Sequence, residues 1–389
     1  MNFFNHIQSE PPDSLFGLNK AFAEDSRAKK VNLGVGTYKT ERLFPYILPV
    51  VRKAEERLVG EEVSKDYLPI DGHRGYVELS KKMAFGEYAT PSVYGAQVLG
   101  GTGGLRTAAD FLKKSGFSRL FLSIPTWDNH YRIFQHSGFS VETYPYLDRE
   151  SNYFAFEKML EAISRMPEKS VLLLQPCCHN PTGYSPTQEQ WQAIVDVVQK
   201  QRLYPFFDSA YQGFDEGVEE DAFPIRLFAK HNVSFALALS HSKNFGLYNE
   251  RAGALFLHCS NEEEAARLGS QIRVTIRGLY SNPPAHGALI VAHILGNADL
   301  KKMWLTELGE MRRRINTLRA ALADALVELP FLREQRGMFS YTGLNTSHVD
   351  KLRDEYAIYL SRDGRINVAG LNRDNVGYVS SAILSVMHA

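Results

Sequence analysis

The chain has 389 residues, of which 44% are hydrophobic, and its 44 Lys and Arg residues are balanced by 44 Asp and Glu residues. This length exceeds the roughly 250–300 residues at which a single hydrophobic core stops growing, so we expect a large domain and a second, smaller one. A formal net charge of zero gives no long-range field, which excludes binding to nucleic acid or to an anionic membrane through overall charge.

The N-terminal residues lack the basic stretch followed by an apolar run that marks a secretory signal, and no window approaches the roughly 18 apolar residues of a membrane span. The three cysteines, Cys177, Cys178 and Cys259, form no CxxC pattern. Reduced, buried thiols are therefore expected, and with them a cytoplasmic protein that has no membrane contact and no metal site.

Through the middle of the chain, short apolar runs typical of buried strands alternate with helical patterns. Strands are expected at 119–123, 141–144, 171–175, 204–208, 235–240 and 254–258, and helices at 105–114, 186–202 and 225–231. This alternation predicts an α/β fold in which helices cover both faces of a mainly parallel central sheet.

The C-terminal part of the chain has a different pattern. A long amphipathic helix is expected at 304–329, followed by strand-like pieces near 338–342 and 365–369 and by a C-terminal helix. We predict a large domain at 46–295 and a small α+β domain formed by 1–45 and 296–389. Ligands of α/β sheets bind beyond the carboxyl ends of the strands, so polar residues that follow the expected strands are candidates for a site.

The first candidate is the glycine cluster GGTGGL at 100–105, which precedes a helical pattern. Glycines let the backbone approach an anion closely, and the N-terminus of a helix presents free N–H groups. Gly101 and Thr102 could therefore bind a phosphate, with a plain loop as the alternative.

Three further candidates follow the next expected strands. Trp127 offers a flat apolar surface for a heteroaromatic ring, or is a half-buried core residue. His130 could orient a carboxylate, or could lie on the surface. Asn180, in the string CCHNPTG, could donate to a ring oxygen.

Asp208 closes an apolar strand in the string YPFFDSAYQGF. An unpaired carboxylate is costly in such a place, and a protonated ring nitrogen would satisfy it. A helix N-cap is the alternative interpretation. Tyr211 could hydrogen-bond a phenolate oxygen on the same ring.

Lys243 lies just beyond an expected strand in the string SHSKNFGLYNERAG at 240–253. Burial lowers the pKa of a lysine and frees its amine as a nucleophile toward an aldehyde, although an isolated loop lysine is usually solvated. Ser240 and Arg251 on either side could bind a phosphate. Together the candidates fit one ligand, an aldehyde-bearing pyridine ring with a phosphate arm, which is pyridoxal phosphate.

Several long strings occur in the same order as in a known family. NPTG, FDSAYQGF, SKNFGLYNERAG, IRGLYSNPPAHGA, RGMFSYTGL and GRINVAGL resemble those of the class I pyridoxal-phosphate-dependent aminotransferases, and among them the aspartate and aromatic branches. The resemblance extends from about Asn19 to the C-terminus. It implies the type I fold of pyridoxal-phosphate-dependent transferases, pyridoxal 5'-phosphate as cofactor, and an obligate homodimer with active sites at the subunit interface.

The resemblance also implies roles for individual residues. Lys243 would bind the cofactor covalently and act as the catalytic base. Asp208 would bind the pyridine nitrogen, and Trp127 would stack on the ring. The ring oxygen would be bound by Tyr211 and Asn180. The phosphate would be held by Gly101, Thr102, Ser240, Arg251 and Tyr67 of the partner subunit.

Two arginines imply the substrate class. Arg365, in GRINVAGL, resembles the family residue that binds the substrate α-carboxylate, and Arg277, in IRGLYSNPP, resembles the one that reaches across the dimer to a distal carboxylate. Gly36, Trp127 and Asn180 would lie beside the substrate. The implied reaction moves the amino group of L-aspartate to 2-oxoglutarate in a ping-pong cycle between pyridoxal and pyridoxamine phosphate.

An aromatic-amino-acid aminotransferase that uses 2-oxoglutarate is the alternative, because that branch carries both arginines too. The residues that resemble the aspartate branch are Lys39, Thr102 and Asn282, and the residues that depart from the usual family pattern are Thr37, Asp66, His241 and Leu279. Two further alternatives are another reaction with the same cofactor, such as β-elimination or decarboxylation, and a noncatalytic regulator that binds it.

Overall fold

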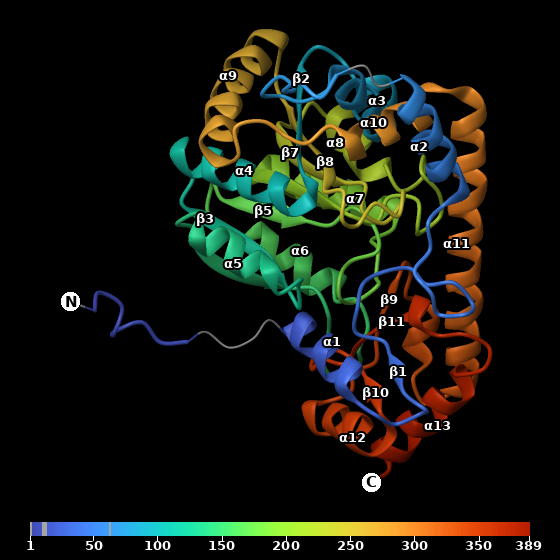
Figure 1. The fold of residues 1–389 in the computed structure, drawn as a ribbon. Coiled ribbons are helices and arrows are strands. Elements are labelled where there is room, and N and C mark those ends of the chain that lie inside the picture. The colour runs from blue at the N-terminus through green and yellow to red at the C-terminus, as the bar shows by residue number, and fades with distance from the viewer. Residues whose placement is uncertain (1, 10–13, 62–63) are drawn as a thin grey trace.

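A computed structural model describes residues 2–9, 14–61 and 64–389. A seven-stranded sheet with the order β2-β8-β7-β6-β5-β3-β4 lies at its centre (Figure 1). The strands in chain order are β2 (Val93–Leu99), β3 (Arg119–Ile124), β4 (Ser140–Pro145), β5 (Val171–Leu174), β6 (Tyr204–Ser209), β7 (Phe235–Ser240) and β8 (Ala252–His258).

The strand directions determine what meets at one edge of the sheet. Strands β3 to β7 are parallel wherever they pair, whereas β8 is antiparallel to both of its neighbours, β2 and β7. The carboxyl ends of β2, β3, β5, β6 and β7 and the amino end of β8 therefore lie along the same edge. The predicted α/β class with a mainly parallel sheet is confirmed, although β2 was not predicted.

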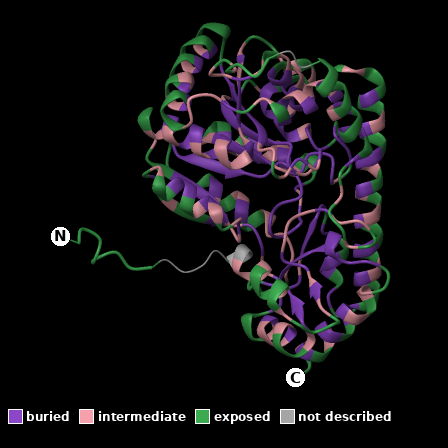
Figure 2. Cartoon of the chain, in the orientation of Figure 1, coloured by how far each residue is buried: buried purple, intermediate pink, exposed green. Residues whose placement is uncertain are grey.

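Helices cover both faces of this sheet. They are α2 (Pro49–Glu61), α3 (Arg74–Phe85), α4 (Gly100–Lys114), α5 (Asn129–His136), α6 (Phe156–Ser164), α7 (Gln188–Lys200), α8 (Phe223–Lys230), α9 (Glu262–Leu279) and α10 (His286–Gly296). Successive residues of a strand point to opposite faces, so Phe206 and Phe207 enter two different hydrophobic clusters. Figure 2 shows the sheet buried between these helices.

A second group of elements combines the start and the end of the chain. It contains α1 (Ser14–Glu24), β1 (Val31–Asn32), α11 (Ala298–Ala325), η2 (Pro330–Arg333), β9 (Phe339–Tyr341), α12 (Thr346–Tyr356), β10 (Ile358–Tyr359), β11 (Arg365–Asn367), η3 (Val368–Gly370) and α13 (Val376–Met387). β1 pairs with β10, and β9 with β11. The long α11 runs beside both groups (Figure 1): Trp304 donates to the Asn244 carbonyl at 2.7 Å, and Arg319 to the Phe339 carbonyl at 3.2 Å.

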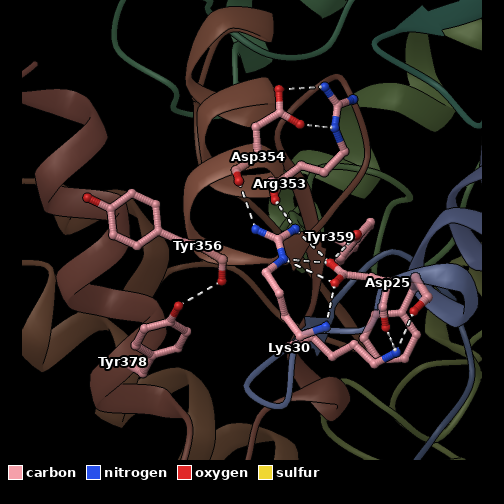
Figure 3. A network of polar contacts seen from close by, with 9 residues as sticks. Asp25, Lys30, Arg353, Asp354, Tyr356, Tyr359 and Tyr378 are labelled. Carbon is pink, nitrogen blue, oxygen red and sulfur yellow. Dashed lines mark hydrogen bonds and ion pairs between the residues drawn. The ribbon is translucent and has the colours of Figure 1, made fainter.

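Cationic side chains near the start of the chain bind carbonyl oxygens at the ends of two helices (Figure 3). Arg27 donates to the carbonyl oxygens of Arg353 and Asp354, at the end of α12, and Lys30 donates to that of Phe22 near the end of α1. The last carbonyls of a helix have no partner within the helix and carry its negative end, so these cations stabilise both termini. The first and last parts of the chain thus form one packed unit.

Some predicted boundaries were wrong. The helix expected at 105–114 begins at Gly100, because the Gly100 N–H donates to the Arg251 carbonyl at 2.8 Å and the chain turns directly from β2 into α4. The helix expected at 304–329 spans Ala298–Ala325, with Asn297 as its N-cap. No helix within the described ranges is both long and apolar enough to cross a membrane.

Candidate active site

A cavity of about 270 Å³ lies beyond the edge of the sheet at which these strand ends meet. The predicted site residues that line it are Gly36, Gly101, Thr102, Trp127, Asn180, Asp208, Tyr211, Ser240, Lys243, Arg251 and Arg365. The parallel strands bring the residues at their carboxyl ends to this cavity. Gly36 and Arg365, which are 329 positions apart, come from the second group of elements and complete it.

Lys243 lies in the turn that follows β7, and its Nζ is 5.0 Å from the centre of the Tyr211 ring. The pKa of Lys243 is lowered from 10.5 to about 8: burial is the largest cause, Asp208 opposes it, and Arg251 and Arg365 act in the same direction as burial. A substantial part of the amine is therefore neutral in mildly alkaline solution. The alternative of a solvated loop lysine is wrong.

Asp208 belongs to β6 and is buried, so the helix N-cap interpretation is wrong. Its Oδ2 is 3.0 Å from Nε2 of His130, whose Nδ1 is 2.8 Å from the Thr126 hydroxyl. Because a carboxylate only accepts, Nε2 donates to Asp208 and the Thr126 hydroxyl donates to Nδ1. His130 is fully buried behind Asp208, and the other Asp208 oxygen is directed toward the cavity side, near Gly101.

One end of the cavity is suited to an anion. Gly101 and Thr102 lie in the first turn of α4, where backbone N–H groups have no partner within the helix. Arg251 approaches from the start of β8, and a Cβ on Gly100 would lie 2.4 Å from Arg251 Nη2, so the contact requires glycine. The Ser240 hydroxyl lies beside this group and donates to Ser242 Oγ at 3.1 Å.

Arg365 forms another wall of the cavity. It donates to Asn180 Oδ1 at 3.0 Å and to the Gly34 carbonyl at 2.9 Å, while its buried Nε has no hydrogen-bond partner. The Phe339 ring lies 4.2 Å from the guanidinium carbon. These contacts hold the guanidinium in place and leave its charge uncompensated.

The charges around the cavity are unequal. Among the described residues, Lys243, Arg251 and Arg365 form no ion pair, and Asp208 is the acidic residue of the lining. Three cations and one carboxylate match a ligand with a phosphate arm, a basic ring nitrogen and an anionic substrate. The residues therefore fit pyridoxal phosphate: an anion cradle at α4, an amine at Lys243 and a carboxylate at Asp208.

Three predicted residues do not line the cavity within one chain: Tyr67, Arg277 and His130, which lies behind Asp208. Tyr67 is 88% exposed, and Arg277 lies in the last turn of α9, where it donates to the Ser281 hydroxyl. The segments that carry them are adjacent, since Asn282 donates to the Leu68 carbonyl at 3.2 Å. Both residues therefore belong to one surface region outside the cavity.

Sequence reasoning assigned no role to several residues that complete the lining: Val35, Thr37, Ala210, Ser242, Tyr248 and Phe339. Ser242 and Tyr248 occur in the same string as Lys243, which is a signal that could have been used. Phe339 lies on β9, paired with β11, and only this pairing brings its ring to Arg365.

The family model for class I and II aminotransferases matches residues 28–383. The chain is 43% identical to the aspartate aminotransferase of Haemophilus influenzae over 99% of this chain and 100% of that protein. It is 41% identical to the mitochondrial aspartate aminotransferase of Xenopus tropicalis, over 99% of this chain and 93% of the other.

Among solved structures, the aromatic-amino-acid aminotransferase of Burkholderia pseudomallei, covalently bound to pyridoxal phosphate, is similar with a TM-score of 0.96. The two chains are 43% identical, and the match covers 99% of this chain and 100% of that one. The predicted fold class is confirmed by this likeness.

Proposed function

The chain belongs to the class I and II aminotransferases, and on that premise we propose that it moves the amino group of L-aspartate to 2-oxoglutarate with pyridoxal 5'-phosphate as cofactor. The observation that carries the proposal is the cavity lined by Asp208 and by Lys243, Arg251 and Arg365, which form no ion pair with any residue that the structure describes. When bound, the cofactor supplies an aldehyde for the amino group and a ring that accepts electrons from Cα.

The residues that would hold the cofactor come from several strand ends. Lys243 would bind it covalently through Nζ, and Asp208, oriented by His130, would hold the ring nitrogen and its proton. Trp127 would lie against the ring, and Tyr211 and Asn180 would bind the ring oxygen. The phosphate would be held by Gly101, Thr102, Ser240, Arg251 and Tyr67 of the partner subunit.

Proton transfer at the substrate is assigned to Lys243. The Lys243 amine would act as the base for the proton on the substrate Cα, and its lowered pKa keeps a useful fraction of the amine unprotonated. Two further residues would take part in catalysis. Asp208 would maintain the positive charge on the ring, and Tyr211 would bind the ring oxygen.

The substrate carboxylates are assigned to two arginines. Arg365 binds the α-carboxylate through the edge that carries its unpartnered Nε, next to Gly36. Arg277 of the partner subunit binds the distal carboxylate, which favours aspartate and glutamate. An aromatic-amino-acid aminotransferase remains the second candidate, supported by the likeness to the Burkholderia enzyme.

We also propose a homodimer, a division into domains and a cytoplasmic location. The exposure of Tyr67 and Arg277 on one surface supports a partner subunit there. The pairing of β1 with β10 supports a small domain of 1–45 and 296–389 beside a large one of 46–295, with α11 extending over both. The three free cysteines support a reducing compartment.

The test is the absorbance of the holoenzyme during addition of L-aspartate, L-tyrosine or L-alanine. Conversion of the bound cofactor to its amine form at the lowest concentration of aspartate would support the proposal. A stronger response to tyrosine would transfer the assignment to the aromatic branch. A spectrum that no amino acid changes would contradict transamination and favour a noncatalytic binding protein.

A further inference from the structure

A separate cavity of about 230 Å³ lies between the later turns of α11 and the segment that joins η2 to β9. The residues that line it are Asn316, Arg319, Ala320, Arg333, Gln335 and Arg336. None of them lines the cavity of the proposed active site. Its lining contains three guanidinium groups and no carboxylate.

Arg319 is the buried member of this group, with 3% of its surface exposed. Its Nε donates to the Ser340 hydroxyl, Nη2 to the Gly337 and Phe339 carbonyls, and Nη1 to Asn316 Oδ1 at 3.2 Å. All four acceptors are neutral, and no carboxylate in the described ranges forms an ion pair with Arg319. A buried charge without a counterion is costly, so this guanidinium favours a nearby anion.

The charged groups near Arg319 do not supply the counterion that its buried guanidinium favours. Burial lowers the pKa of Arg319 to about 10, so it stays protonated at neutral pH; Arg336 lowers it too, while Cys178 and Asp215 raise it. Asp215 is 3.9 Å from Arg336 Nε and accepts a hydrogen bond from Ser185. The carboxylate that acts on Arg319 is therefore already engaged by Arg336 and Ser185.

The other two arginines stand at the rim. Arg333 is paired with Asp324. Arg336, besides its 3.9 Å contact with Asp215, donates through Nη1 to the carbonyl oxygens of Arg333 and Gln335. The fixed fork of a guanidinium suits the oxygens of a phosphate or a carboxylate. Arg319 from within and Arg336 from the rim can thus meet the same small anion.

We propose that this cavity is a binding site for a small inorganic oxyanion such as phosphate, with Arg319 Nη1 and the Arg336 guanidinium as its ligands. The bound anion neutralises the charge that anchors Gly337 to Ser340, the segment that includes the active-site residue Phe339. The site is independent of the proposed aminotransferase reaction, because its residues lie outside that cavity.

The test is a titration of the holoenzyme with inorganic phosphate at constant ionic strength, with chloride as the comparison salt. Binding is measured as the rise in the thermal unfolding temperature. In Arg336→Gln the apparent Kd for phosphate should rise about tenfold, because one charge-assisted hydrogen bond is lost. Arg333→Gln removes another cation of the cavity lining and should weaken binding in the same direction. Arg313→Gln removes an equal charge from an exposed position of α11 and should leave the apparent Kd unchanged.

All variants retain the active-site cations, so any phosphate bound there contributes equally to each titration. Identical phosphate responses in the wild type, Arg336→Gln and Arg333→Gln would overturn the proposal. Crystals of the holoenzyme soaked in selenate give a direct check. An anomalous peak beside Arg319 is expected, and a peak confined to the active site would overturn it.

Discussion

At Lys243 two effects on one amine act in opposite directions. Removal from water and the two neighbouring arginines favour the neutral form, whereas the Asp208 carboxylate favours the ammonium. The balance lowers the pKa to about 8. A fully solvated lysine, with a pKa near 10.4, would be almost entirely protonated at the same pH and would react slowly with an aldehyde.

This balance predicts the pH dependence of cofactor capture by the apoenzyme. Below pH 8 the unprotonated fraction of Lys243 falls about tenfold per pH unit, so the rate of covalent capture should fall in parallel; above pH 8 it should level off. Stopped-flow absorbance after mixing with pyridoxal phosphate measures this rate. A midpoint near 10.5 would contradict the lowered pKa, and Lys243→Ala should show no covalent capture at any pH.

At the scale of secondary-structure elements, most strands and helices could be predicted from the hydrophobic pattern and from the residues at helix ends. The six strands expected from apolar runs correspond to β3 to β8. Five of them are largely buried, as expected for continuous apolar segments, whereas β4 is an edge strand most of whose residues are not buried. β2 was missed because Gly95 and Gln97 interrupt its apolar pattern. It forms through pairing with β8, which is a contact between residues about 160 positions apart.

Helix α7 is an element whose start the sequence specifies locally. The Thr187 hydroxyl accepts from the Gln190 N–H, and the Gln190 side chain accepts from the Thr187 N–H, which together form a capping box. Thr187→Ala should destabilise the holoenzyme by about 1 kcal/mol, measured by urea unfolding. Thr317→Ala, an exposed threonine within α11, should change stability by less than about 0.5 kcal/mol. Equal losses in the two variants would show that the cap contributes nothing specific.

At the scale of the whole molecule, the proposed active site requires two subunits. Lys243 and Arg365 line the cavity, but Arg277 lies outside it on the exposed surface that also carries Tyr67. If Arg277 binds the substrate in the partner's cavity, each active site combines Lys243 of one subunit with Arg277 of the other.

Hybrid dimers test this dependence. When Lys243→Ala and Arg277→Ala subunits are mixed equally and reassociated, each hybrid has one site with both defects and one intact site. Because half of the dimers are hybrids, aspartate aminotransferase activity should recover to about a quarter of the wild-type level. Each variant alone, taken through the same dissociation, is the control. No recovery above the unmixed variants would mean that Arg277 acts within its own subunit.

The sequence by itself determined the fold class and most of the candidate cavity lining, because these residues stand in long local strings at the ends of recognisable strands. Strand position is encoded locally, and parallel pairing then brings the strand ends to one edge. Phe339 was not assigned from the sequence because its contact with Arg365 depends on the pairing of β9 with β11.

Only the tertiary structure decided which charges lack a counterion. The motifs of the sequence singled out Lys243 and Arg365 but gave no sign of Arg319; what the three share is burial and the absence of an ion pair among the described residues. Both properties are set by residues distant in the chain. The cost of a buried charge depends on every group around it, so it can be assessed only when those groups have positions in space.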